Sequence, residues 1–395
     1  MSIKNARSFN INHTYKNPMT EKKVVKNIVF IRASAIYPDS RLEKEVESMV
    51  SAGYSVSVLA WDRKDWLKNV DSNKKYHLFR IPLRAPVGKL TILFWPIWWI
   101  LAGIWLLFHK WDVVHAADFN CYPPALFVAK IKRKKLVYDI YDFFPDTASL
   151  PGILRSIAYF VDTQGMKYAD RLIVVDHCRL GQINHEGDES VCVLYNSPND
   201  FESQNRNRTN TDKFCVFYGG THQSDRDILS MVMVAKEIPD IEVIIAGGGN
   251  PNVVQQLSQV VDTIPNARHL GVRPYSEILS YSQECDLLFA LYDPSNRNNK
   301  LASPNKLFEA MMCGKPIIIN EEVAAADKVR EENCGLVVPY GDYEALKEAV
   351  LTLKNNPELR KELGENGRRA YETKYNWKIM EKRLLNLYAS LEKEQ

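Results

Sequence analysis

The chain has 395 residues, of which 46% are apolar and 25% are charged, as in ordinary soluble proteins of two or three domains. This composition excludes a disordered chain, a collagen-like repeat and a small disulfide-stapled protein. The seven cysteines are scattered without metal-ligand spacing, which is typical of reduced thiols in a cytosolic protein. The net charge of +3 hides an uneven distribution, because residues 1–200 carry +7 and residues 201–395 carry −4.

The first half of the chain alternates short apolar runs with amphipathic stretches. Residues 1–23 are polar and predict a loose tail. The spacing of apolar residues over 41–52 predicts a helix that ends at Gly53. We expect strands at 26–31, 54–61, 76–84, 111–116, 135–142, 170–176 and 190–196. This order favours a parallel, doubly wound sheet over residues 24–197.

The same rhythm restarts after a polar, turn-rich stretch at 198–212, which we interpret as a linker. We expect strands at 213–220, 241–249, 267–272, 285–291, 315–320 and 334–340, and helices at 343–353 and 376–392. The chain is therefore predicted to be α/β, with two Rossmann-like domains at 24–197 and 213–375 and a terminal helix at 376–395. Ligands bind beyond the carboxyl ends of parallel strands, so we expect the site in a cleft between the domains.

One apolar run departs from the ordinary composition. Residues 90–108 contain no charge and hold four of the eight tryptophans: Trp95, Trp98, Trp99 and Trp105. The run is long enough to span a membrane. However, it connects two strands predicted to share one sheet, and Pro96 interrupts it. We therefore favour a helix that lies in a membrane interface, where tryptophans are enriched. A buried crossover helix is the alternative.

Basic residues surround this run. They include the segment IKRKK at 131–135, Lys130 before it, and Arg80, Arg84, Lys89, His109 and Lys110 beside the run. Each basic residue near anionic lipid contributes about 1 kcal/mol to binding. No motif for nucleic acid is present. We therefore expect a peripheral or monotopic protein at the cytoplasmic face of a membrane.

A helix start in the second half predicts an anion site. Ser303, Pro304 and Asn305 predict a helix start, with a cap residue and a proline near the first turn, and Lys306 adds a cation in that turn. A lysine in the first turn opposes the positive end of the helix dipole. Its presence there therefore indicates a bound anion that offsets both positive charges. A solvated surface lysine is the alternative.

The segment from 303 to 317, SPNKLFEAMMCGKPI, resembles the donor-site signature of family 4 glycosyltransferases, which have the GT-B fold. Further segments resemble that family in the same order: 38–60, 111–130, 213–228, 271–279 and 371–388. The resemblance covers residues 26–390. It implies that the terminal helix returns to the first domain and that the enzyme uses a nucleotide-diphosphate sugar and retains the anomeric configuration. It also implies no metal, since Lys, Arg and a helix end replace the cation.

The resemblance assigns roles to several donor-side residues. Glu309 accepts hydrogen bonds from the ribose, and Arg226 binds the diphosphate. Gly219 and Gly220 follow a strand, so their backbone can approach a phosphate closely. Arg273 follows a predicted strand end and is expected to line the base pocket, with an ordinary surface arginine as the alternative. The alternatives are an ordinary surface carboxylate for Glu309 and an ion pair with a neighbouring aspartate for Arg226.

The sequence departs from the family at two positions. Leu301 replaces a glutamate that would contact the sugar, and Ala117 replaces the second histidine of an H-x-H motif. We predict that Asp118 takes the catalytic role with His115 nearby, although a buried imidazole and a loop cap are the alternatives. Asp142, at the end of the next predicted strand, is expected on the acceptor side.

These observations predict a hexosyl- or other glycosyltransferase that acts on a lipid-linked acceptor, in the biosynthesis of surface polysaccharide, capsule, lipopolysaccharide or glycolipid. No cofactor is expected, because the nucleotide sugar is a co-substrate. A nucleotide-sugar 2-epimerase on the same fold is one alternative. A catalytically silent scaffold is the other, because Leu301 and Ala117 break the family pattern. The donor base, UDP, GDP or dTDP, stays open.

Overall fold

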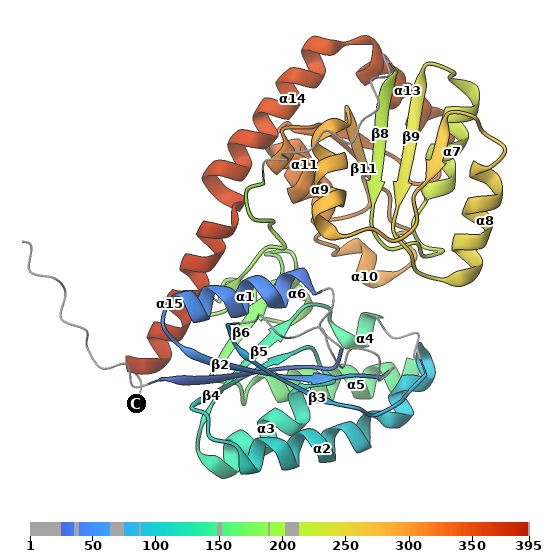
Figure 1. Ribbon diagram of the computed structural model, residues 1–395. Coiled ribbons are helices and arrows are strands. Elements are labelled where there is room, and N and C mark those ends of the chain that lie inside the picture. The colour runs from blue at the N-terminus through green and yellow to red at the C-terminus, as the bar shows by residue number, and fades with distance from the viewer. Residues whose placement is uncertain are drawn as a thin grey trace, which may run out of the picture.

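The computed structural model describes residues 25–34, 39–63, 75–86, 88–147, 152–188, 190–201 and 213–393. The predicted tail at 1–23 lies outside these ranges, as does most of the predicted linker. Figure 1 shows two α/β domains, one from each half of the chain, joined along one side by the C-terminal helices.

The first domain contains a seven-stranded parallel sheet in the order β3-β2-β1-β4-β5-β6-β7. Its strands are β1 (Asn27–Arg32), β2 (Ser55–Trp61), β3 (His77–Ile81), β4 (Val113–Ala117), β5 (Lys135–Ile140), β6 (Arg171–Val174) and β7 (Cys192–Val193). Its helices are α1 (Ser40–Ser51), α2 (Trp95–Phe108) with a 3₁₀ turn η1 (Lys89–Phe94) before it, α3 (Tyr122–Lys132), α4 (Phe144–Thr147), α5 (Gly152–Met166) and α6 (Arg179–Gln182).

The second domain contains a six-stranded parallel sheet in the order β10-β9-β8-β11-β12-β13. Its strands are β8 (Phe214–Gly219), β9 (Ile241–Ala246), β10 (Ala267–His269), β11 (Leu287–Ala290), β12 (Ile317–Asn320) and β13 (Gly335–Val338). Its helices are α7 (Ile228–Glu237), α8 (Pro251–Val261), α9 (Tyr275–Glu284), α10 (Arg297–Lys300), α11 (Asn305–Cys313), α12 (Ala325–Glu331), α13 (Tyr343–Asn355) and α14 (Pro357–Ala370).

The chain then returns to the first domain through a π-helical turn η2 (Tyr371–Tyr375) and the helix α15 (Trp377–Lys393). The Trp377 indole N–H donates to Ser48 Oγ of α1 at 3.0 Å. Tyr54 Oη and Glu392 Oε1 lie 3.1 Å apart, near the end of α15. The predicted α/β fold of two doubly wound domains with a returning C-terminal helix is confirmed (Figure 1).

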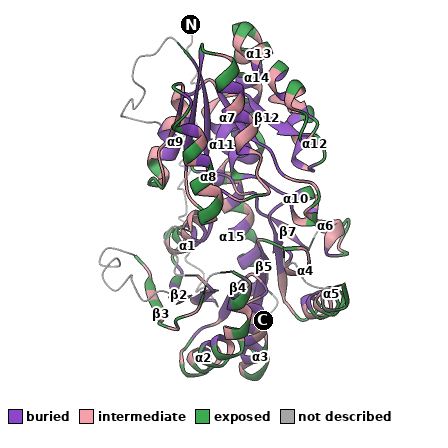
Figure 2. Ribbon diagram, turned by 90° about the vertical axis from the view of Figure 1, so that its right-hand side faces the viewer, coloured by how far each residue is buried: buried purple, intermediate pink, exposed green. Residues whose placement is uncertain are grey.

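The apolar run forms η1 and α2, and its two ends lead into β3 and β4 of the same sheet. By length and composition it is the one helix in the described ranges that can cross a membrane, and 28% of it is buried. Figure 2 shows α2 and α3 at the outer end of the molecule, with exposed residues on both. The exposed apolar side chains here are Leu90, Leu93, Ile97, Ile100, Leu101, Ile104, Leu107, Phe108, Phe127 and Ile131.

The tryptophans of this run divide into two kinds. Trp95, Trp99 and Trp105 are partly exposed. Trp98 is fully buried, stacks on Trp61 with ring centroids 5.4 Å apart, and donates to the Asn120 carbonyl. The prediction that Trp98 contacts a membrane is therefore wrong. A helix that is apolar all round gives no pattern that separates its inner face from its outer face.

Candidate active site

A cleft of about 760 Å³ separates the two sheets. Residues of both halves line it at the carboxyl ends of their strands, as expected for doubly wound sheets. From the first half these include Arg32, Asp39, Arg41, Tyr141, Asp142, Arg179 and Asn196; from the second, Gly219, Gly220, Arg226, Gly247, Arg273, Tyr275, Tyr292, Asn298, Ser303, Asn305, Lys306 and Glu309.

Lys306 lies in the first turn of α11, which begins after Pro304. Its side chain is 7% exposed, and Nζ lies 4.3 Å from the centre of the Tyr218 ring. Burial lowers the pKa of this amine, but the Tyr218 and Tyr292 hydroxyls and Glu309 outweigh that effect and raise it. No carboxylate in the described ranges lies within ion-pair distance of Nζ. A buried, charged amine at a helix start is thus available to an anionic ligand.

The backbone of Gly219 and Gly220 passes close to this amine. A Cβ atom placed on Gly220 would lie 2.5 Å from Lys306 Nζ, and one on Gly219 would lie 2.5 Å from an Ile278 methyl group. Gly247 has φ +135°, and a Cβ there would overlap the Gly220 carbonyl. A side chain at Gly220 would therefore fill the space beside Lys306, and side chains at Gly219 or Gly247 would push these turns apart.

Two arginines complete this wall. Arg226 lies 3.9 Å above the Tyr292 ring, forms an ion pair with Asp225 at 2.8 Å and donates to Asn299 Oδ1 at 3.0 Å. The ion pair that we weighed against a binding role is thus present, although Arg226 also lines the cleft. Arg273 is exposed at the cleft wall.

Glu309 lies deeper in the same wall and is 3% exposed. The Tyr275 hydroxyl donates to its Oε1 at 3.0 Å. Burial raises the pKa of Glu309, while Lys306 opposes this. The structure therefore brings together Gly219, Gly220, Arg226, Arg273, Ser303, Asn305, Lys306 and Glu309 in one cleft.

The opposite wall carries three arginines that sequence reasoning missed, each paired with carboxylates. Arg32 contacts Asp39 at 2.9 Å and also Asp118. Arg179 contacts Asp142 at 3.2 Å. The remaining one, Arg41, contacts Asp139 at 3.1 Å and Glu45 at 3.0 Å. The only sequence signal was their place near predicted strand ends or, for Arg41, after a helix start.

Asp142 lines the cleft from the first half, and its side chain is 54% exposed. Its Oδ1 accepts from Arg179 and, at 3.0 Å, from the Asn298 amide of the second half. Asp142 therefore joins the two walls at one point of the cleft.

The predicted catalytic pair is placed differently. His115 is fully buried between β1 and α15, stacks on Phe30, and hydrogen-bonds Tyr388 and Asp139. Because its side chain has no exposed surface, the prediction that it acts on a substrate is corrected to the alternative of a buried imidazole. Asp118 is absent from the cleft lining. Its carboxylate instead contacts Arg32 and accepts from the backbone N–H groups of Tyr141 and Asp142, which do line the cleft.

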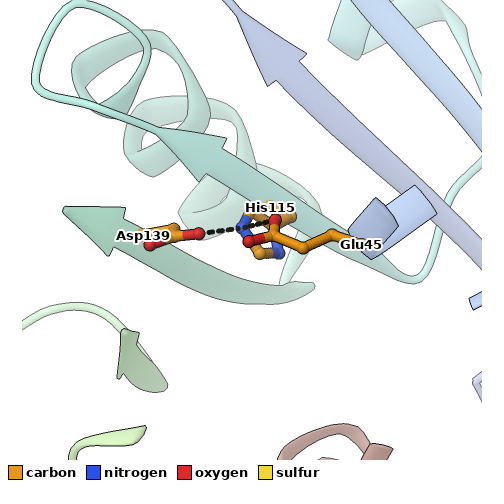
Figure 3. A group of neighbouring side chains, drawn as sticks. All are labelled: Glu45, His115 and Asp139. Atoms are coloured by element: carbon orange, nitrogen blue, oxygen red, sulfur yellow. Dashed lines mark hydrogen bonds and ion pairs between the residues drawn. The ribbon is translucent and has the colours of Figure 1, made fainter. Parts of the chain in front are cut away.

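His115 belongs to a buried group with Glu45 and Asp139, shown in Figure 3. Their ligand atoms lie within 4.8 Å of one another, which is compatible with a metal. However, Arg41 contacts both oxygens of Asp139 and forms an ion pair with Glu45. Its guanidinium already supplies the positive charge, so the donor set does not fit a metal ion.

Comparison with known proteins gives a family match for the second half of the chain. Residues 199–370 match the family of glycosyl transferases group 1. An uncharacterized glycosyltransferase of Methanocaldococcus jannaschii is 27% identical over 67% of this chain and 72% of its own length. A phosphatidyl-myo-inositol mannosyltransferase of Mycobacterium leprae is 22% identical over 79% of this chain and 81% of its own.

Another relative matches a shorter part. A GDP-mannose-dependent mannosyltransferase of Corynebacterium glutamicum that acts on a monoacylated phosphatidylinositol monomannoside is 29% identical over 42% of this chain and 43% of its own length. A group 1 glycosyltransferase domain therefore lies in the second half of this chain, and its relatives include enzymes of glycolipid biosynthesis.

Solved structures share the whole fold. Sucrose-phosphate synthase from Thermosynechococcus elongatus has a TM-score of 0.78 at 16% identity, covering 94% of this chain and all of its own. Anabaena HepE, solved with UDP and glucose, has a TM-score of 0.71 at 16% identity, covering 93% of this chain and all of its own. The chain therefore has the GT-B fold of these glycosyltransferases.

Proposed function

We propose that this protein is a retaining glycosyltransferase that moves a sugar from a nucleotide-diphosphate sugar to a lipid-linked glycan acceptor. The observation that carries the proposal is Lys306, a buried cation without a carboxylate partner in the described ranges, at the start of α11 and beside the Gly219–Gly220 backbone. This combination suits a diphosphate, which needs positive charge and backbone amides.

The chemistry that this wall supports is departure of a nucleoside diphosphate. Negative charge grows on the diphosphate as its bond to the sugar breaks. Lys306, Arg226 and the α11 amides stabilise that charge more in the transition state than in the ground state. They take the place of a metal ion, so transfer is proposed to be metal-independent. Glu309, held by Tyr275, is proposed to accept the ribose hydroxyls.

The acceptor proposal rests on the outer surface of the first half. The side chains of α2 leave large apolar residues exposed, Ile100 at 62% and Phe108 at 84%. Lys130, Arg133 and Lys134 lie in or after α3, which packs against α2. An exposed apolar surface with a basic border fits an anionic membrane. We propose that the enzyme lies on the cytoplasmic face of a membrane, where a lipid-linked acceptor is available.

The central test is a thermal-shift panel of UDP-, GDP- and dTDP-sugars, followed by transfer of the bound sugar to a lipid-diphosphate acceptor in EDTA. We expect stabilisation by one nucleotide class and retained anomeric configuration in the product. Turnover of the nucleotide sugar without an acceptor would instead identify an epimerase. Donor binding without any turnover would identify a scaffold, and absence of binding to every donor would refute the proposal.

The membrane part has its own test. The double variant Ile100→Asp, Ile104→Asp changes two exposed side chains, so we expect unchanged folding and a loss of about tenfold or more in binding to anionic liposomes. Trp98→Ala is the matched contrast, because Trp98 is buried and its loss lowers stability by about 3–5 kcal/mol. Equal liposome binding by wild type and the double variant would contradict membrane contact through α2.

A further inference from the structure

A continuous chain of hydrogen bonds crosses the molecule beneath the cleft. It begins on α15, where the Tyr388 hydroxyl lies 2.9 Å from His115 Nδ1. The opposite ring nitrogen of His115 lies 3.3 Å from Asp139 Oδ2. Figure 3 shows the His115 and Asp139 side chains from β4 and β5 with Glu45 of α1 beside them. The C-terminal helix is thus bonded to the centre of the first sheet.

Arg41 continues this chain toward the second half. Its Nη2 donates to both oxygens of Asp139, and its Nη1 donates to the Leu194 carbonyl at 2.7 Å and to Asn196 Oδ1 at 3.1 Å. The Asn196 amide then donates to the Ser303 carbonyl at 3.2 Å. Asn196 follows β7, whereas Ser303 precedes α11 of the second sheet. This last bond therefore joins the two halves.

Each of these hydrogen bonds can be assigned a donor and an acceptor without conflict. Asp139 is an anion, because Arg41 holds its pKa low against the effect of burial. The His115 Nε2–H then donates to Asp139, which leaves Nδ1 to accept the Tyr388 proton. Glu45, whose pKa is raised by burial and by Asp139, completes the group. Each bond from Tyr388 to Ser303 joins one donor to one acceptor. Glu45 contacts Arg41 as an ion pair at 3.0 Å, and neither of its oxygens has a hydrogen-bond partner in the described ranges.

We propose that Arg41 is a positioning residue, which fixes the Ser303 loop at the start of α11 through Asn196 and links that loop to the docking of α15 through Asp139 and His115. The Ser303 loop also holds a polar group that is free to bind a ligand. Ser303 Oγ is buried, lines the cleft and has no hydrogen-bond partner in the described ranges. A loop held from behind by its carbonyl presents this hydroxyl and the α11 amides to the donor.

The sharpest test is Asn196→Asp. Aspartate keeps an oxygen for Arg41 but has no amide hydrogen for Ser303, so it removes the Asn196–Ser303 bond and leaves the Asp142–Asn298 bond between the halves in place. We expect faster hydrogen exchange in the peptide that covers residues 300–310, and about 5- to 10-fold weaker binding of UDP or GDP, whichever binds the wild type. Asn199→Asp is the matched control, because Asn199 is exposed in the same segment.

A second pair of variants tests the link to α15. Tyr388→Phe and Tyr54→Phe each remove one hydroxyl between the first sheet and α15, but only Tyr388 belongs to the chain. We expect Tyr388→Phe to raise exchange in residues 300–310 about two- to threefold and Tyr54→Phe to leave it unchanged. Equal exchange in both variants would overturn the link to α15.

The inference depends on the proposed function only for its binding measurement. Exchange in residues 300–310 that Asn196→Asp leaves at the wild-type rate, in a protein with unchanged global stability, would overturn the positioning role. Failure of the wild type to bind either nucleotide would instead refute the proposed function, and the exchange measurement would still decide whether Arg41 positions the loop.

Discussion

The two walls of the cleft hold similar numbers of cations but differ in how many of those cations are paired with carboxylates. On the wall of the first half, Arg32, Arg41 and Arg179 all contact carboxylates. On the wall of the second half, Lys306 and Arg273 have no carboxylate partner in the described ranges, although Arg226 is paired. Pairing with a carboxylate weakens the attraction of a guanidinium for a bound anion, whereas Lys306 and Arg273 retain theirs in full. The difference favours the second wall as the site of the anionic donor that we propose.

The largest expected effect concerns the pairing on the first wall. Asp139→Asn keeps the shape of the side chain but leaves the buried Arg41 without its main counter-charge. Breaking a buried pair in this way costs about 3–5 kcal/mol of the free energy of unfolding, measured by urea denaturation. Asp240→Asn removes one partner of an exposed pair with Lys354 and is expected to cost about 1 kcal/mol or less. Equal losses would show that the first wall does not depend on its pairing.

The second wall is tested by Lys306→Met, which keeps the length of the side chain and removes its charge. We expect the variant to fold, because no carboxylate in the part of the chain that the structure describes is paired with Lys306. We expect kcat/KM for transfer to fall about 100-fold or more. Initial rates and nucleotide binding measure this effect. Lys361→Met on the exposed surface of α14 is the control. Near wild-type transfer by Lys306→Met would remove the contrast between the walls.

The same contrast explains why the residues of the second wall could be predicted from the sequence and those of the first wall could not. The donor helix is a local signal, because Ser303, Lys306 and Glu309 lie within seven positions of the chain and share one helix start. The network on the other wall is non-local, since Arg41 meets Asp139 from 98 residues away and Leu194 from 153. Such pairings follow from the order of the strands. Periodicity predicts that the strands exist and leaves open which of their side chains meet.

The two misplaced residues have the same physical origin. His115 lies in a strand whose five residues are all buried, so alternation gives no face that is turned to the cleft. Trp98 lies in a helix that is apolar all round, so its periodicity gives no inner face. In both cases the alternative that was weighed against function, a packed core side chain, is the one that the structure contains.

The smallest expected effect concerns the floor of the second wall, beneath Gly247. His222 is fully buried, and its ring centroid lies 5.1 Å from that of His269. Burial, followed by the charge of His269, lowers the pKa of His222 to about 4. The unfolded chain binds this proton at about pH 6.5, earlier than the folded one. Stability from this group is therefore complete above pH 6.5 and declines as the pH falls toward 4.

The variant His222→Gln isolates this contribution. In wild type the free energy of unfolding loses at most about 1.4 kcal/mol per pH unit from His222 across this window, and the variant is expected to lose that much less. Urea denaturation at several pH values between 7 and 4 measures the difference in slope. His185→Gln is the control, because His185 is partly exposed and paired with Asp188. Parallel pH profiles of wild type and His222→Gln would show that burial beneath the glycine turns does not lower the pKa of His222 relative to the unfolded chain.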